Sequence, residues 1–188
     1  GTATHVILPC IGEHNVMNAA AAFCIGMLAG MAPEEIAGAL HTYQPDGMRQ
    51  NIRKLGEQTV ILDCYNASPD SMRASLSVLG QLSVAGRRIA VLGDMLELGE
   101  QSDRLHRMVG SMIKPDQVDL LFCCGPESSA IAEEAARQGV PVQHFLEKEA
   151  LTEQLRHTIQ PGDAILFKAS RGMQLESVAK ALFAELAS

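Results

Sequence analysis

The sequence predicts an α/β protein whose main domain is a Rossmann-like, mostly parallel sheet with helices on both faces. From residue 59 onward, short apolar runs alternate with stretches of helical spacing, the pattern of consecutive β-α-β units. The runs are almost entirely apolar, as expected of parallel strands buried on both faces. The first 45 residues differ, because they contain only one short apolar run and two helical stretches.

The five predicted strands of the main domain are short and rich in β-branched or apolar residues. They are "TVILD" (59–63), "RIAVLG" (88–93), "DLLFCCG" (119–125), "PVQHFL" (141–146) and "DAILFK" (163–168). Two of the intervening helices show a clear apolar face. The faces consist of Met72, Leu76, Leu79 and Leu82 on the first, and of Leu175, Val178, Leu182 and Leu186 on the last.

Helix starts are marked by capping residues. We expect Ser68 to be the N-cap of the first helix, with Pro69 at its first position and Asp70 in its first turn. The segment "SRGMQLESV", which begins at Ser170, is expected to open the final helix.

The N-terminal region is predicted to be an incomplete domain, residues 1–45, followed by a complete α/β domain, residues 46–188. "THVIL" (4–8) predicts a short strand, and "HNVMNAAAAFCIGMLAG" (14–30) and "MAPEEIAGALHTY" (31–43) predict two helices. These elements are too few to bury a core alone. The Pro/Gly turn "QPDGM" (44–48) would serve as a linker.

Composition narrows the possible partners. The formal net charge is −7 and no Lys/Arg-rich stretch is present, so neither nucleic acid nor an anionic membrane is expected as a partner. The chain shows no signal-peptide pattern, which predicts a cytoplasmic location. Its 5 cysteines form no CxxC pair and are expected to be reduced, packed thiols, and the 6 histidines lack zinc-site spacing, so no protein-bound metal is expected.

Polar residues follow the predicted strands where ligands bind in an open α/β sheet, outside the carboxyl ends. The residues at these strand ends, two glycines included, are Asp63, Tyr65, Asn66, Gly93, Asp94, Glu97, Gly125, Lys168, Ser170 and Arg171. Turn chemistry would explain any single group, but their convergence on one edge favours a pocket.

Two of these groups allow two interpretations each. Lys168, Ser170 and Arg171 could form a carboxylate or phosphate site at a helix start, or only a capped helix with a solvated arginine. The acids of "GDMLELGE" could serve catalysis or could be solvent-facing carboxylates at a helix entry. No phosphate loop, dinucleotide fingerprint or hydrolase elbow is present, so the residues alone name no reaction.

Four segments resemble the Mur ligase family in sequence, order and spacing. They are "GEHNVMNAAAA", "DCYNASPDSM", "AVLGDMLELGEQS" and "KASRGMQLESV". The similarity runs from about His5 to the end of the chain and is strongest to the ligases that join D-alanyl-D-alanine to UDP-N-acetylmuramoyl-tripeptide. It implies that the chain matches the end of a central ATPase domain plus the C-terminal domain, and that the phosphate loop, the magnesium ligands and the UDP-binding domain lie upstream of Gly1.

The resemblance also implies a chemistry. ATP, with Mg bound mainly by the missing part, would phosphorylate the carboxylate of the tripeptide, and the amine of D-alanyl-D-alanine would attack the acyl phosphate. The chain alone is expected to be inactive, and the intact enzyme is expected to be monomeric. Domain closure would align the amine and exclude water.

Residue roles follow from the same resemblance. Asn15 and Asn18 match positions that meet the adenine, Arg49 one that reaches the nucleotide phosphates, and Asp63 one that bonds the ribose. The residues matched to the dipeptide site are Tyr65, Asn66, Lys168, Ser170 and Arg171.

Two alternatives remain open beside this interpretation. The chain could be a stand-alone module that binds a nucleotide or a peptide without chemistry. It could also belong to another ligase of the superfamily, such as folylpolyglutamate synthase or the meso-diaminopimelate-adding enzyme, although "GDMLELG" and "SRGM" argue against this.

Overall fold

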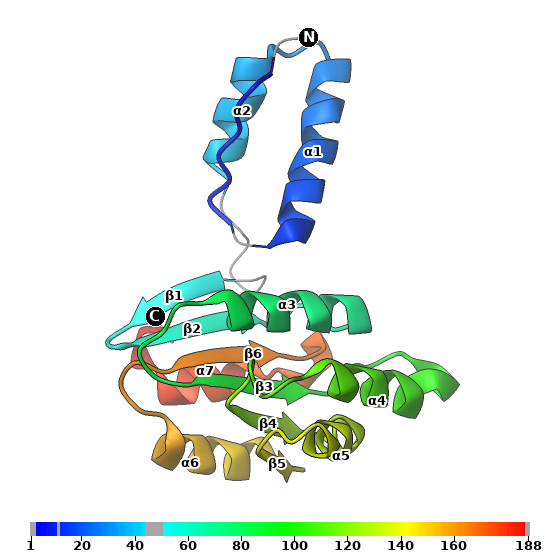
Figure 1. Ribbon diagram of the computed structural model, residues 1–188, viewed down its shortest axis with the longest axis vertical. Coiled ribbons are helices and arrows are strands. Elements are labelled where there is room, and N and C mark those ends of the chain that lie inside the picture. Colours follow the sequence, from blue (N-terminus) through cyan, green and yellow to red (C-terminus); the bar gives the residue numbers. More distant parts are fainter. Residues whose placement is uncertain (1–2, 11, 44–50, 187–188) are drawn as a thin grey trace. The chain divides into compact units, whose positions relative to one another are not determined.

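The computed structural model describes residues 3–10, 12–43 and 51–186 (Figure 1). The chain divides into two compact units, Gly1–Asp46 and Gly47–Ser188. Within the described residues, no helix is both long and apolar enough to cross a membrane.

The first unit contains two helices, α1 (Glu13–Leu28) and α2 (Pro33–His41), both of which were predicted. They meet at Gly26, where an added Cβ would lie 2.8 Å from Cδ1 of the buried Ile36, so the absence of a side chain permits the close approach. The predicted strand at residues 4–8 is wrong. This segment has no strand structure, because the described part of the unit contains no second strand that could satisfy its backbone.

The second unit is built on a six-stranded sheet in the order β1-β2-β6-β3-β4-β5. The strands are β1 (Asn51–Leu55), β2 (Gln58–Asp63), β3 (Arg88–Gly93), β4 (Leu120–Cys124), β5 (Val142–Phe145) and β6 (Ala164–Lys168). Only the β1–β2 pair is antiparallel among these, so the predicted mostly parallel α/β sheet is confirmed. Strand β1 was not predicted, although Gly56 (φ 57°) marks the tight turn that joins it to β2.

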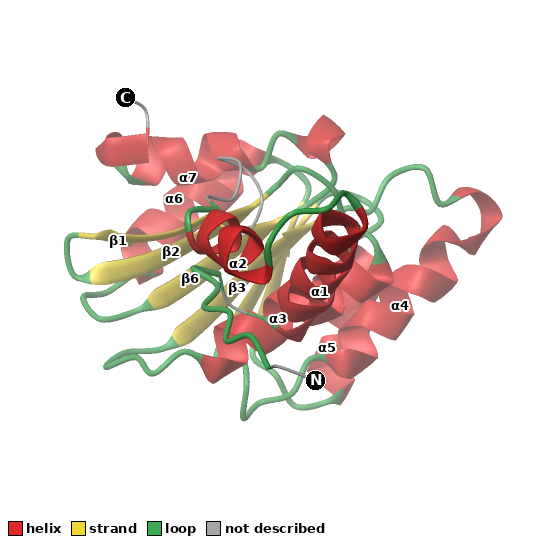
Figure 2. Ribbon diagram, turned by 90° about the horizontal axis from the view of Figure 1, so that it is seen from above, coloured by secondary structure: helices red, strands yellow, loops and turns green. Residues whose placement is uncertain are grey.

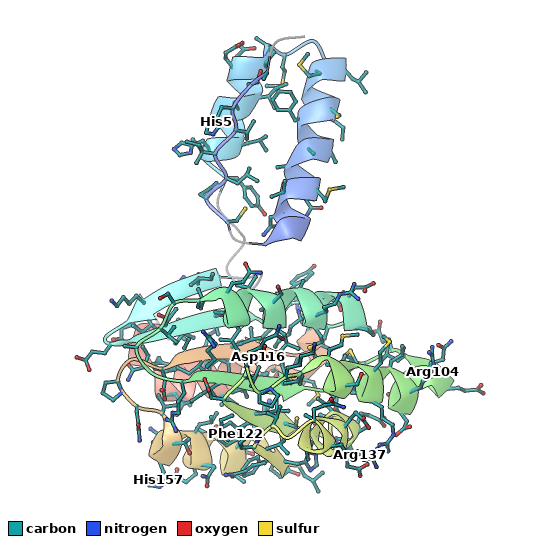
Figure 3. The ribbon with its side chains drawn as sticks, viewed as in Figure 1. His5, Arg104, Asp116, Phe122, Arg137 and His157 are labelled. Atoms are coloured by element: carbon teal, nitrogen blue, oxygen red, sulfur yellow. The ribbon has the colours of Figure 1, made fainter. Side chains whose placement is uncertain are left out.

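Helices cover both faces of this sheet (Figure 2). One apolar cluster packs α3 (Pro69–Gln81), α4 (Ser102–Met112) and α5 (Ser129–Arg137) against one face. A second packs α6 (Lys148–Thr158) and α7 (Glu176–Leu182) against the other. Phe122 on β4 lies fully buried in the second cluster, whereas His157 on α6 projects outward (Figure 3).

Helix ends confirm one prediction and correct another. Ser68 is the N-cap of α3 and its hydroxyl accepts from the backbone N–H of Ser71, with Pro69 at the first position. The predicted start of the last helix at Ser170 is wrong. A 3₁₀ turn spans Arg171–Met173, Gln174 adopts a left-handed conformation (φ 50°), and α7 begins only at Glu176.

Candidate functional site

A buried ion pair lies at the carboxyl ends of β2 and β6. Asp63 and Lys168 end their strands at paired positions, and Lys168 Nζ lies 2.7 Å from Asp63 Oδ2. The side chains are 11% and 1% exposed, respectively. The Ser75 hydroxyl on α3 donates to the same carboxylate oxygen at 2.5 Å. The pair therefore joins two strands and a helix beneath the edge of the sheet.

The loop after β2 is attached to this pair. Lys168 Nζ also donates to the Asn66 carbonyl at 3.0 Å, and Asn66 Oδ1 accepts from the Ala67 N–H at 2.8 Å. The Cys64 thiol donates to the Phe167 carbonyl at 3.3 Å. Burial, followed by the nearby charges of Glu176 and Asp63, raises the pKa of Cys64 to about 12. The thiol is therefore a packing and hydrogen-bonding group rather than a nucleophile at neutral pH.

Three predicted residues form the outer layer of this edge. Asn66 and Arg171 are exposed and Tyr65 is half-buried. The Arg171 guanidinium lies 5.4 Å from the centre of the Tyr65 ring, a cation–π arrangement that joins the loop after β2 to the loop after β6. The edge thus presents an arginine and an amide, both suited to a carboxylate or phosphate ligand.

The loop after β3 is fastened to the loop after β6 by two hydrogen bonds. The Ser170 N–H donates to the Asp94 carbonyl at 3.1 Å, and the Ser170 hydroxyl accepts from the Leu96 N–H at 2.9 Å. Ser170 is only 6% exposed, so its side chain serves the connection between loops.

Asp94 was expected to be either catalytic or solvent-facing, and the structure shows that it does not face solvent. Its side chain is 2% exposed, and Oδ1 accepts from the Ser128 N–H at 2.7 Å, just before α5. A Cβ at Gly125 (φ 113°) would lie 2.5 Å from this carboxylate, so only glycine fits there. Asp94 and Gly125 together join the ends of β3 and β4. Glu97 and Glu100 are exposed.

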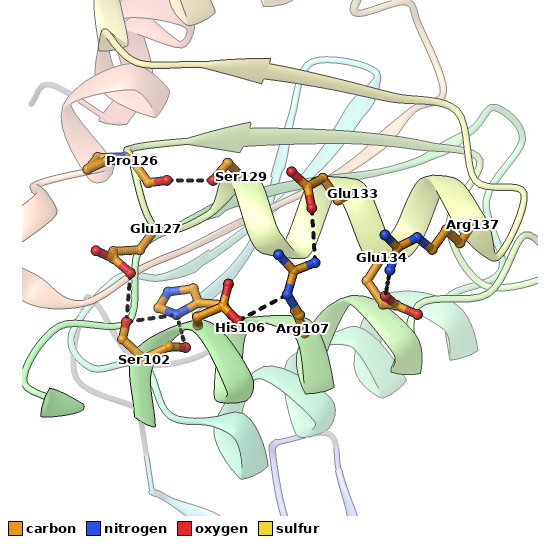
Figure 4. Close-up of polar contacts among 10 residues, drawn as sticks. Ser102, His106, Arg107, Pro126, Glu127, Ser129, Glu133, Glu134 and Arg137 are labelled. Atoms are coloured by element: carbon orange, nitrogen blue, oxygen red, sulfur yellow. Dashed lines mark hydrogen bonds and ion pairs between the residues drawn. The ribbon is translucent and has the colours of Figure 1, made fainter. Parts of the chain in front are cut away.

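A fully buried histidine shapes the same loop. His106 Nε2 accepts from the Met95 N–H at 2.9 Å, so the other ring nitrogen, Nδ1, carries the hydrogen and donates to the Ser102 carbonyl at 2.8 Å. Figure 4 shows Ser102 next to the ring, with its hydroxyl donating to Glu127 at 2.9 Å. His106 thus connects α4 to the β3 loop as a neutral imidazole.

The first unit has its own cavity of about 210 Å³. It is lined by Leu8, Cys10, Asn15, Asn18, Ala19, Ala22, Leu40 and Tyr43. The two asparagines predicted to meet adenine therefore share a mostly apolar hollow with an aromatic ring. Such a hollow suits a planar heteroaromatic base, because the apolar walls cover its faces while amides can pair with its edge.

The structure thus gathers the predicted residues into two groups. Asn15 and Asn18 line the cavity of the first unit, whereas Asp63, Tyr65, Asn66, Lys168, Ser170 and Arg171 lie at the β2–β6 edge of the second. Arg49 lies outside the described residues. Within the described ranges, no cluster of three or more His, Cys, Asp or Glu could hold a metal ion.

Sequence reasoning missed Ser75 and His106. Ser75 lies three residues after Met72 and four before Leu79, on the apolar face of α3. This was the available signal, because a serine on the core side of a helix needs a buried partner. His106 lies four residues after Ser102 on one helix, but nothing in the sequence indicates that its ring meets the Met95 backbone.

Comparison with known proteins gives the class of this chain. A family model described as "Mur ligase, glutamate ligase domain" matches residues 48–171, which is most of the chain. The chain therefore belongs to the Mur ligase family.

The relatives found within this family carry a more specific name. UDP-N-acetylmuramoyl-tripeptide–D-alanyl-D-alanine ligase of Bacillus subtilis is 42% identical over 178 residues, which cover 93% of this chain and 39% of that protein. The enzyme of the same name from Escherichia coli is 36% identical over 180 residues, covering 94% of this chain and 38% of that protein. The chain thus spans about two-fifths of the length of these relatives.

Solved structures agree with this relationship. MurF from Acinetobacter baumannii superimposes with a TM-score of 0.85 at 30% identity, over 98% of this chain and 40% of that one. MurF from Thermotoga maritima in complex with ADP gives a TM-score of 0.77 at 26% identity, over 95% of this chain and 40% of that one.

Proposed function

We propose that this chain forms the nucleotide-base and acceptor part of a cytoplasmic, ATP-dependent amide ligase that joins D-alanyl-D-alanine to UDP-N-acetylmuramoyl-tripeptide in peptidoglycan synthesis. The observation that carries the proposal is the β2–β6 edge, where Arg171, Tyr65 and Asn66 converge outside parallel strands. The names of the B. subtilis and E. coli relatives support the choice of substrates.

In this proposal the edge binds the acceptor dipeptide. The Arg171 guanidinium, held against the Tyr65 ring, pairs with the dipeptide carboxylate, and the Asn66 amide donates a further hydrogen bond. Asp63, which the resemblance matches to a ribose contact, is 8% exposed and accepts from Lys168 and Ser75, so in this proposal it supports the edge from beneath. The inward-facing Lys168 and Ser170 support these groups from below, since both are buried. Held in this way, the dipeptide amine is directed at the activated carboxyl group.

The cavity of the first unit would receive the adenine, with Asn15 and Asn18 at the base edge. That the T. maritima MurF structure contains ADP supports a nucleotide site in this family. Arg49 would reach the phosphates. We assign no magnesium ligand to the described residues, and expect the metal and the phosphoryl chemistry to depend on the remaining three-fifths of the length seen in the relatives.

The reaction then proceeds in two steps. The terminal carboxylate of the tripeptide takes the γ-phosphoryl group of ATP, releasing ADP. The dipeptide amine attacks the acyl carbon, a C–N bond forms, the C–O bond to phosphate breaks, and the amine loses a proton. This chain would contribute by orienting the amine and by covering the site against water.

An NMR titration of the chain tests the binding roles, because shift mapping detects weak binding. D-alanyl-D-alanine should shift the amides of Tyr65, Asn66 and Arg171, and ATP should shift those lining the first cavity. The variant Arg171→Met should weaken dipeptide binding about tenfold or more, while Arg104→Met, on the exposed side of α4, should leave it unchanged (Figure 3). Equal affinity in the two variants would contradict the role of Arg171.

Activity provides the second test. The isolated chain should release no phosphate from ATP when all three substrates are present. Phosphate release by this chain would contradict the proposal that the phosphoryl chemistry depends on the part of the relatives that this chain does not match.

A further inference from the structure

The β2–β6 edge has an inner layer beneath the residues proposed to meet the ligand. The inner layer contains Lys168, Asp63 and Ser75, and the outer layer contains Tyr65, Asn66 and Arg171. One atom, Lys168 Nζ, connects the two layers, because it donates both to Asp63 Oδ2 at 2.7 Å and to the Asn66 carbonyl at 3.0 Å.

Lys168 is oriented inward by these bonds. Its side chain is 1% exposed, and it would have to give up a buried carboxylate and a backbone carbonyl to reach a dissolved ligand. Leaving Asp63 without its counter-ion beneath the edge is unfavourable, because a buried charge needs a partner. The geometry therefore argues against a direct contact between Lys168 and a dipeptide carboxylate.

We propose that Lys168 is a positioning residue that fixes the loop 64–68, and thereby sets Tyr65 and Asn66 for the acceptor, without touching the acceptor itself. The consequence for the ligand depends on the proposed function, whereas the effect on the loop does not. It is a role that the sequence alone would not suggest, since a lysine after a strand is the usual candidate for a direct anion contact.

Each side of the connection is fixed independently. On the Asp63 side, strand pairing places the two residues opposite each other, and the Ser75 hydroxyl shares the same carboxylate oxygen. On the loop side, Asn66 Oδ1 is used by the Ala67 N–H, so the group that the side chain can offer outward is its Nδ2 amide, a donor. Removing the Lys168 ammonium should release the Asn66 carbonyl and change where this donor points.

The first experiment needs no ligand. Amide spectra of the ¹⁵N-labelled chain are compared for wild type, Lys168→Met and the control Lys180→Met, an exposed lysine on α7. We expect the amides of residues 64–68 and of Arg171 to shift in Lys168→Met and to stay unchanged in Lys180→Met. An unchanged loop spectrum in Lys168→Met would overturn the positioning role.

The second experiment separates positioning from contact. Affinities of wild type and Lys168→Met are measured for D-alanyl-D-alanine and for its C-terminal amide, which lacks the carboxylate charge. Positioning predicts that Lys168→Met weakens both ligands by a similar factor of about ten and keeps the preference for the acid. If the ratio of the affinities for the acid and for the amide fell to near one in Lys168→Met, Lys168 would contact the carboxylate directly and the proposal would be refuted.

The two experiments also separate this inference from the proposed function. If wild type binds neither dipeptide, the acceptor role of this edge fails, while the ligand-free spectra still decide whether Lys168 fixes the loop. If Lys168→Met does not fold, the double variant Asp63→Asn/Lys168→Met is used, because it buries no unpaired charge. It still lacks the donor to Asn66, so the same loop shifts are expected, and their absence would overturn the role.

Discussion

Ion pairs lie at both ends of strand β6, and the two pairs differ in the groups that they hold in place. Before the amino end, Asp163 Oδ2 lies 2.7 Å from Arg87 Nη2. At the carboxyl end, Lys168 Nζ lies 2.7 Å from Asp63 Oδ2. The N–O distance is the same in both pairs, and in both a basic side chain meets an aspartate carboxylate. The groups that surround the two pairs differ.

The amino-end pair is surrounded by turns. Asp163 also accepts from the backbone N–H groups of Arg87 and Gln160, each at 2.9 Å, and Arg87 donates to the Thr158 carbonyl at 2.7 Å. Every further partner is a backbone group with a structural purpose. The carboxyl-end pair instead supports the loop that contains Tyr65 and Asn66. The comparison indicates that the amino-end pair contributes to the fold alone, whereas the carboxyl-end pair contributes to the fold and also holds the loop of the proposed acceptor site.

Loss of the carboxyl-end cation should have the largest effect on stability. Lys168→Met removes the counter-ion of a largely buried carboxylate, so we expect the free energy of unfolding to fall by about 3–5 kcal/mol. Lys180→Met is the control and should change it by less than about 0.5 kcal/mol. Chemical denaturation of the three proteins measures this. A loss equal to that of the control would mean that Asp63 is adequately solvated without Lys168.

The amino-end pair should give a smaller loss with a clear pH signature. Burial acts to raise the pKa of Asp163, but the hydrogen bonds from Arg87 and Gln160 outweigh it, and the pKa is lowered from its ordinary value of 3.8. The folded state thus binds fewer protons than the unfolded state in acid. The stabilisation is complete above pH 3.8 and is lost as the pH falls through the lower, folded pKa.

Asp163→Asn should therefore lower the free energy of unfolding by about 1.5–3 kcal/mol at neutral pH. The variant should also lose less stability than wild type on acidification, because it has no carboxyl group at position 163 to become protonated. The control is Asp116→Asn, an exposed acid in the turn before β4. Denaturation between pH 2 and 7 is the measurement, those limits being roughly the range over which carboxyl groups titrate. Parallel pH profiles of wild type and Asp163→Asn would contradict the lowered pKa.

The Ser75 hydroxyl also contacts Asp63 at the carboxyl end of β6, and its removal should lower stability less than either change above. Ser75→Ala deletes a hydroxyl that lies 2.5 Å from Asp63 Oδ2 and 3.0 Å from the Ser71 carbonyl, but leaves the ion pair intact. We expect a loss of about 1–2 kcal/mol. Ser77→Ala, on the exposed side of the same helix, should be nearly neutral. Equal losses in the two variants would exclude Ser75 from the cluster.

The smallest effect is expected for alkylation of Cys64, the thiol at the β2–β6 edge. Because the pKa of Cys64 is raised to about 12, little thiolate forms at mildly alkaline pH. Iodoacetamide should modify the exposed Cys24 and leave Cys64 intact, as read by peptide mass spectrometry. Modification of Cys64 at a rate similar to that of Cys24 would indicate that the edge opens in solution.

Local signals in the sequence were sufficient for most of the fold. The apolar runs predicted β2 to β6, and Ser68 with Pro69 predicted the start of α3, because caps and periodicity depend on near neighbours. The predicted strand at residues 4–8 failed because a strand needs a partner, which a local pattern does not supply. The left-handed Gln174 likewise has no local signal.

The candidate site was predictable only in part, for a related reason. Polar residues after strands correctly marked the edge, but which residues face each other depends on pairing between β2 and β6, whose ends lie 105 residues apart. The inward direction of Lys168, the burial of Asp94 and the contact between His106 and the Met95 N–H all follow from such distant pairing. A sequence shows which groups are present, but not which of them neutralise one another.

The strand order has a consequence for how the second unit is made. Strand β6 lies between β2 and β3, so the centre of the sheet is filled by the strand that is synthesised last. Until Ala164–Lys168 leaves the ribosome, no strand can join β1–β2 to β3–β4–β5, so the apolar β2 and β3 lack the partner that they share in the complete sheet. Completion of the fold must therefore wait for late synthesis, and nascent chains stalled before β6 should depend on chaperones.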